Sequence, residues 1–154
     1  MFFRSATILL AVCAVYVAAS IGTEYIENLM TMVSDAESKA ELASAKNDIS
    51  LPKRDRNVLI LNIMMKQPNA VKDVFFLNLL SEQSKQALKN QLAQAQLKDL
   101  EPEVREAYLK MEDLKLDMSI SDYQQEQEEQ YVRNQLTKRQ REILETVGTP
   151  EFEA

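Results

Sequence analysis

Histidine and tryptophan are absent from this 154-residue sequence, which has one cysteine and two glycines. Because Cys13 has no second thiol to pair with, no intrachain disulfide can form and the fold must be stable through packing alone. After Cys13 the chain offers neither an imidazole to shuttle protons nor a thiol for nucleophilic attack. Neighbouring carboxylates such as Glu112 and Asp113 are typical of a solvated helix surface. We expect a binding protein and not an enzyme.

The scarcity of glycine also indicates the fold class. Between Gly22 and Gly148 the chain lacks the residue that hairpins and bulges most often need. It is rich instead in residues that favour helices. We therefore predict an all-α protein, a single compact domain of about six or seven short helices in which Gly148 terminates the last helix. The helices are expected at 23–45, 52–66, 70–80, 82–98, 102–116, 122–135 and 138–147. Two short apolar runs, 58–65 and 74–80, are alternatively compatible with a pair of strands.

The N-terminal segment has the features of a secretory signal peptide. Arg4 precedes an apolar run at 6–19 that ends in small residues. The run is shorter than the ~20 apolar residues that a membrane-spanning helix needs. We expect cleavage after Ala19 or Ser20, so that 1–19 is the signal peptide, 20–148 the helical domain and 149–154 a tail. The mature chain is then expected to be extracellular, without stable membrane insertion.

The net charge of the sequence and its two basic clusters indicate which kinds of partner to expect. Eighteen basic residues against 24 acidic residues give a net charge of −6. An acidic chain without a basic stripe argues against nucleic acid and anionic membranes as main partners. The clusters KRDR at 53–56 and KRQR at 138–141 match convertase sites of a peptide precursor. Both clusters lie in expected helices, so the favoured interpretation is that they are solvent-exposed charged residues and not cleavage sites.

A helix-start pattern recurs at Leu51, Leu80, Leu100 and Leu136. Each leucine precedes a polar or proline-containing turn, then a basic residue and an apolar pair, which is typical of a capped helix start. The unequal spacing excludes a solenoid with a fixed period.

The segment LDMSISDYQQEQEE, 116–129, is the strongest candidate for a metal site. Without His and Cys ligands in the mature chain, any metal should be a hard ion such as Ca²⁺ or Mg²⁺. Asp122 stands where a calcium loop needs glycine, and Ser121 with Gln124 forms an S-x-x-Q capping box that explains the segment as a helix start. The helix start is the favoured interpretation. With Asp117 as position one, the expected side-chain ligands of the weak site are Asp117, Ser119, Ser121, Gln125 and Glu128, and Tyr123 would donate its carbonyl.

The apolar runs at 58–65 and 74–80 carry the alternative functional hypothesis. A helix that is apolar all round should be buried, so the simplest interpretation is a core. The alternative is a cavity for a fatty acid or another lipid, in which flexible methionine side chains adapt to the ligand. Its expected lining is Leu59, Ile63, Met64, Phe75, Phe76 and Leu79.

The C-terminal third resembles a known family. Pro102-Glu103, Asp117 with Ser119-Ile120-Ser121, the Gln/Glu-rich run 124–129 and the Leu-x-x-x-x-Arg-x-x-Leu helix at 136–144 are similar to the nematode SXP/RAL family of small secreted antigens. The resemblance implies a secreted all-helical protein, often described as carrying a cation-binding domain, without an established enzymatic role. The apolar runs more loosely resemble the nematode fatty-acid- and retinol-binding proteins, which implies a lipid cavity inside a helical shell.

These observations define one expected function and one alternative. We expect a secreted helical binding or antigen protein that requires no cofactor and binds a divalent cation weakly. The alternative is a secreted carrier of a fatty acid or other small hydrophobic ligand. The partner is expected in the extracellular space or in a host, and its identity is left open.

Overall fold

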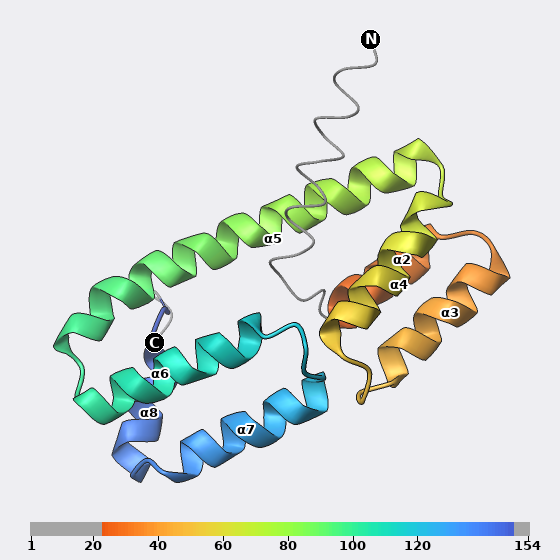
Figure 1. Ribbon diagram of the computed structural model, residues 1–154. Coiled ribbons are helices and arrows are strands. Elements are labelled where there is room, and N and C mark those ends of the chain that lie inside the picture. The colour runs from red at the N-terminus through yellow and green to blue at the C-terminus, as the bar shows by residue number, and fades with distance from the viewer. Residues whose placement is uncertain (1–22, 150–154) are drawn as a thin grey trace. The chain divides into compact units, whose positions relative to one another are not determined.

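The computed structural model describes residues 23–149 of the chain (Figure 1). The expected signal peptide and all but the first residue of the expected tail lie outside this range. Over the described residues the backbone forms seven α-helices, one 3₁₀ turn and no strand, which confirms the all-α prediction. The runs at 58–65 and 74–80 are helical. No helix within this range is both long enough and apolar enough to cross a membrane.

The chain divides into two compact units, whose boundaries fall at 76/77, 115/116 and 124/125, each inside a helix. Within the described range, unit 1 comprises 23–76 and 116–124, and unit 2 comprises 77–115 and 125–149. Unit 1 is therefore discontinuous in sequence, because the segment 116–124 belongs with the N-terminal half. Contacts between residues distant in the chain must hold that segment in place.

Unit 1 contains α2 (Thr23–Met32), α3 (Ala36–Asn47), α4 (Lys53–Met65) and the beginning of α5 (Asn69–Gln96). Helix α3 packs against both α2 and α4 (Figure 1). The prediction of one helix over 23–45 was wrong, because Asp35 interrupts it as an N-cap whose carboxylate accepts a 2.7 Å hydrogen bond from the Ser38 amide. The buried apolar side chains of this unit are Ile26, Leu29, Val33, Leu42, Ala45, Ile60, Ile63, Met64 and Phe75.

Unit 2 contains the rest of α5, the 3₁₀ turn Leu97–Asp99, α6 (Pro102–Leu116) except its last residue, α7 (Asp122–Asn134) from Gln125 onward, and α8 (Lys138–Thr146). Arg105 satisfies carbonyls where α5 ends, since its Nε donates to Leu97 O at 2.9 Å and its Nη2 to Leu100 O at 3.1 Å. The core cluster consists of Ala93, Leu97, Val104, Ala107, Tyr108, Met111, Val132, Leu136, Leu144 and Val147.

Helix α5 runs without a break through the point where two helices were expected. The prediction of separate helices at 70–80 and 82–98 was wrong, and the helix start inferred at Leu80 lies inside α5. The Ser84 hydroxyl donates a 2.9 Å hydrogen bond to Leu80 O one turn earlier, so the serine is accommodated within the helix. Neither glycine nor proline occurs in α5 to stop it.

Gly148 ends α8 as predicted. Its φ of 79° lies in the left-handed region, and its amide donates to Gln96 Oε1 at 2.6 Å. A Cβ at this position would lie 3.0 Å from Lys89 Cγ and 3.2 Å from Lys89 O. Both the backbone conformation and the close approach therefore require glycine.

We expect Gly148→Ala to lower the free energy of unfolding by about 1–2 kcal/mol, the cost of the left-handed conformation for a residue with a Cβ. Urea denaturation measures the loss. Arg139→Ala, an exposed position on the same helix, serves as control and should change stability little. If Gly148→Ala is as stable as the wild type, glycine is not required at this position.

Candidate functional site

Two loops of unit 1 share the same short sequence pattern and the same local structure. Residues 48–52 read Asp-Ile-Ser-Leu-Pro between α3 and α4, and residues 117–121 read Asp-Met-Ser-Ile-Ser between α6 and α7. In the first, Asp48 Oδ1 accepts hydrogen bonds from Ser50 N at 3.1 Å and Ser50 Oγ at 2.6 Å. In the second, Asp117 Oδ1 accepts them from Ser119 N at 2.9 Å and Ser119 Oγ at 2.6 Å. Each loop is therefore an Asx turn followed by a helix.

The two loops pair with each other, and we call the pair the loop clasp. An antiparallel bridge joins Pro52 to Ser121. The first amides of α4 donate into the second loop, Lys53 N to Ile120 O at 3.0 Å and Arg54 N to Met118 O at 2.9 Å. In return, Tyr123 N of α7 donates to Ile49 O of the first loop at 3.2 Å. Each loop thus caps the helix that follows the other.

This reciprocal capping explains how a proline can precede α4. Pro52 occupies the N-cap position and makes no side-chain capping hydrogen bond. The first amides of a helix have no partner within the helix, and an uncapped buried helix start is unfavourable. The carbonyls of 117–121 supply the missing acceptors, so the second loop completes α4.

Two cations of α4 are buried beside the clasp. Lys53 is 0% exposed, and its Nζ donates to the Asp117 carbonyl at 3.2 Å. Arg56 is 2% exposed, and its guanidinium binds both carboxylate oxygens of Asp122, with Nη2 donating to Oδ1 at 3.1 Å. Burying a charge is costly unless it is paired and hydrogen-bonded. The segment that carries Asp117 and Asp122 therefore stabilises the inward face of α4 electrostatically as well as through its backbone.

The two aspartates that begin the loops are ionised and face solvent. The Ser119 hydroxyl and amide hold the pKa of Asp117 below its ordinary value of 3.8, and the Lys53 charge contributes in the same direction. Ser50 lowers the pKa of Asp48 in the same way. Both carboxylates thus carry full charge at neutral pH and are accessible from outside.

The expected calcium ligands lie on two different elements. Helix α7 begins at Asp122, and the capping box is present, with Ser121 N donating to Gln124 Oε1 at 2.9 Å and Gln124 N to Ser121 Oγ at 3.2 Å. Asp117, Ser119 and Ser121 share the loop. The side chain of Gln125 donates instead to Glu129 at 2.7 Å.

Glu128 is exposed on α7, roughly 9 Å further along the helix axis than Asp122. The twelve-residue loop geometry is therefore not formed. Over residues 23–149 no group of three or more His, Cys, Asp or Glu side chains is arranged to hold a metal ion.

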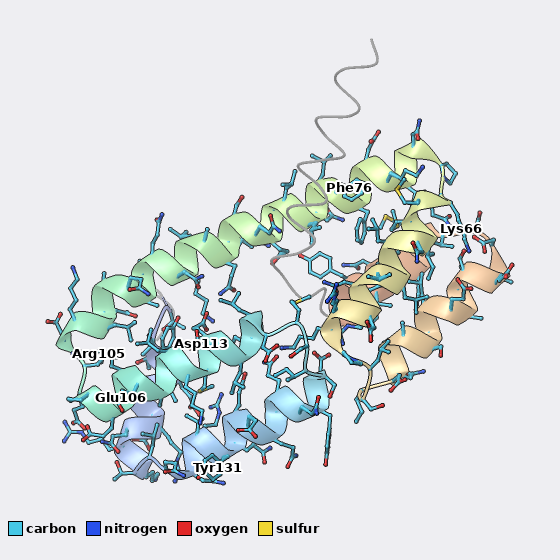
Figure 2. The ribbon with its side chains drawn as sticks, viewed as in Figure 1. Lys66, Phe76, Arg105, Glu106, Asp113 and Tyr131 are labelled. Atoms are coloured by element: carbon cyan, nitrogen blue, oxygen red, sulfur yellow. The ribbon has the colours of Figure 1, made fainter. Side chains whose placement is uncertain are left out.

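The expected lipid-lining residues are mostly buried. Ile63, Met64 and Phe75 lie in the interior of unit 1, and Leu79 is buried in unit 2. Leu59 and Phe76 are half-buried, and Phe76 lies on α5 (Figure 2). The Phe75 and Phe76 rings meet edge to face with centroids 5.5 Å apart.

The side-chain hydroxyl of Tyr25, in unit 1, has no hydrogen-bond partner within the described part of the chain. The hydroxyl oxygen of Tyr25, on α2, is buried and makes no hydrogen bond. Most buried polar atoms in folded proteins are hydrogen-bonded, so an orphaned one calls for a specific explanation.

Sequence reasoning missed the clasp and the orientation of α4. The KRDR cluster was expected to be solvated, yet Lys53 and Arg56 are buried, whereas Val58 is 51% and Met65 47% exposed. The expectation that the run 58–65 is buried on all sides was therefore wrong. The repeated Asp-x-Ser pattern at 48–50 and 117–119 was the available signal for the pairing.

Comparisons with protein-family models, with curated proteins and with solved structures find no match to this chain. The assignment of function therefore depends on the contacts within unit 1.

We expect Asp122→Asn to lower the free energy of unfolding by about 1.5–3 kcal/mol, the usual contribution of hydrogen bonds to a charged group. The loss should lie toward the lower end, because the Asp122 side chain is 38% exposed and solvent screens the pair. Urea denaturation measures stability. Hydrogen exchange should show faster exchange at the Lys53 and Arg54 amides.

Glu128→Gln removes an exposed carboxylate from the same helix and is the matched control. If Asp122→Asn and Glu128→Gln have equal stability and equal exchange at α4, the ion pair does not hold the clasp closed.

Proposed function

We propose that the mature protein is a secreted, non-enzymatic carrier of a small hydrophobic ligand that has a polar head group, bound within unit 1. Secretion is supported by the signal-like character of residues 1–19. The observation that carries the binding proposal is the buried Tyr25 hydroxyl, which has no hydrogen-bond partner among the described residues.

The unpaired Tyr25 hydroxyl favours the binding of a ligand that accepts a hydrogen bond. A buried polar group left without a hydrogen bond costs about 1–3 kcal/mol, and the cost is recovered when a partner binds. A phenol donates well to a carboxylate, and such charge-assisted hydrogen bonds are stronger than neutral ones. A fatty acid provides this acceptor together with an apolar chain.

The apolar part of the ligand would meet side chains of the same unit. Ile63, Met64 and Phe75 are buried there, and the half-buried Leu59 and Phe76 belong to the same two helices. Met64 is unbranched and polarisable, so it can repack around an acyl chain at low cost. The looser resemblance of these runs to nematode lipid-binding proteins supports the same ligand class.

We expect a fluorescent fatty acid to bind the mature chain saturably at micromolar concentrations. In Tyr25→Phe the affinity should fall about tenfold, which corresponds to about 1.4 kcal/mol, because the hydroxyl no longer donates to the carboxylate. The stability of the ligand-free variant should be unchanged or raised, because the orphaned hydroxyl is gone. Fluorescence titration and thermal unfolding measure the two effects.

Tyr131→Phe is the matched control, since it removes the hydroxyl of a tyrosine that is 59% exposed on α7. It should leave fatty-acid affinity unchanged. Absence of saturable binding by the wild type rules out the carrier function.

The second candidate function is weak binding of Ca²⁺ or Mg²⁺ at the loop clasp. It is favoured by two exposed, ionised carboxylates, Asp48 and Asp117, at equivalent positions of paired loops. Few carboxylates and the nearby Lys53 charge imply an affinity no tighter than about 1 mM, as in the weakest extracellular calcium modules.

For this candidate, calorimetric titration of the mature chain with Ca²⁺ should give a weak saturable heat that Asp117→Ala abolishes and Glu128→Ala leaves unchanged. The reason is that Asp117 lies in the clasp, whereas Glu128 lies out on α7. Loss of the heat in both variants would instead support a shared twelve-residue site. A wild-type titration at millimolar Ca²⁺ that matches the heat of dilution removes the cation function.

A further inference from the structure

The middle of α5 carries no buried side chain. Residues 80–91, which we call the α5 midsegment, are all exposed except Gln83, which is half-buried. The nearest buried residues on either side are Leu79, at 6% exposure, and Ala93, at 0%. About three turns of helix therefore lack the tertiary packing that supplies most of the stability of helices in proteins.

The side-chain interactions within the midsegment join residues one turn apart. Lys85 pairs with Glu82 at 2.5 Å, between side chains that are 69% and 47% exposed, and the Gln86 amide donates to Asn90 at 2.9 Å. Exposed pairs of this kind stabilise a helix only slightly. An isolated helix shorter than about 12–15 residues is marginal in water. The midsegment can therefore open while the packed ends of α5 stay folded.

The sequence of the midsegment contains a helix start that the continuous helix does not use. The run LSEQSKQAL, 80–88, has its leucines, its hydroxyl residue and its basic residue at the same positions as LTKRQREIL, 136–144. In the second run Thr137 is the N-cap of α8, and its side chain accepts a hydrogen bond from the Gln140 amide. Ser81 occupies the equivalent position, and serine is among the strongest N-cap residues.

The first and ninth residues of this pattern are covered at the other three helix starts and exposed in α5. At the start of α8, Leu136 is 8% and Leu144 6% exposed, whereas Leu80 is 50% and Leu88 59% exposed. At the starts of α4 and α6 the corresponding residues are half-buried or buried: Leu51, Leu59, Leu100 and Tyr108. The continuous form of α5 thus keeps in water two apolar side chains that this kind of helix start covers.

We propose that α5 is a hinge that opens at Ser81 into two shorter helices, 69–80 and 82–96. In the open form Ser81 leaves the helical conformation and caps the second helix, so its side chain accepts from the Ser84 amide. That bond replaces one of the backbone hydrogen bonds lost at the break. Opening lets the two ends of α5 turn relative to each other and frees Leu80 and Leu88 to leave the solvent. The hinge is independent of the carrier function.

Native-state hydrogen exchange of the intact chain locates the break. In the open form the amides of 81–83 have lost their carbonyl partners one turn earlier, while those of 86–91 keep theirs. We expect protection factors at 81–83 to be roughly tenfold lower than at 86–91. Even protection across 80–91 overturns the proposal, because it describes a helix that is rigid or frays as a whole.

Two serine variants separate the cap from general helix stability, because they make the same chemical change at exposed positions three residues apart. Ser81→Ala removes the N-cap of the open form and should slow exchange at 81–83 about fivefold. Ser84→Ala should change it by no more than about twofold, since residue 84 is helical in both forms. Equal slowing in the two variants would show that Ser81 is not a cap.

Two proline variants test whether a helix start is built in at this point. Glu82→Pro places proline at the first residue of the second helix, where it is tolerated, and should lower the midpoint of thermal unfolding by only a few degrees. Ala87→Pro lies inside that helix in both forms and should lower the midpoint by about 10 °C or more. Circular dichroism measures both. An equal loss in the two variants overturns the hinge, since proline would then meet the same continuous helix at both positions.

Discussion

The burial of Lys53 and Arg56 at the start of α4 is the constraint on which the rest of unit 1 depends. Removing two charges from water is expensive, and the cost is recovered only through close, hydrogen-bonded partners. Those partners lie 64 and 66 residues away in the sequence, in the segment that links α6 to α7. The electrostatic need of α4 therefore brings a distant loop into unit 1 and makes the unit discontinuous.

The same loop also completes the hydrogen bonding of α4, and the two effects reinforce each other. Pro52 has no side-chain group with which to cap the helix, so the first amides of α4 depend on the carbonyls of Met118 and Ile120. Once those backbone bonds form, Asp122 is placed to receive Arg56. The backbone hydrogen bonds and the ion pairs are cooperative, because each set holds the loop in the position that the other set needs. Losing one set therefore also weakens the other. The apolar outward face of α4 is a consequence, because the inward face is already occupied.

Local features of this fold were predictable from sequence, and distant ones were not. The Ser121 capping box and the Gly148 helix stop depend on a few neighbouring residues, so their patterns predict them correctly. The break at Asp35 also had a local signal in the Asp-x-x-Ser spacing, but the apolar periodicity on either side hid it. Burial of Lys53 depends on a contact with a residue 64 positions further along the chain, which periodicity cannot reveal. For the candidate site, the segment 117–121 was identified, whereas its partner 48–52 was missed although both contain Asp-x-Ser.

The arrangement of charge at the clasp explains why a loop with oxygen donors need not depend on a metal. Asp117 faces a cation that is covalently part of the chain, since the Lys53 charge acts on its carboxylate and the Lys53 ammonium binds its carbonyl. A fixed ammonium loses no translational freedom when the loop closes, whereas a free ion must be captured from solution. Any dication at this site must therefore act beside a positive charge that is already in place. The Lys53 ammonium thus acts as an internal counterion for the second loop.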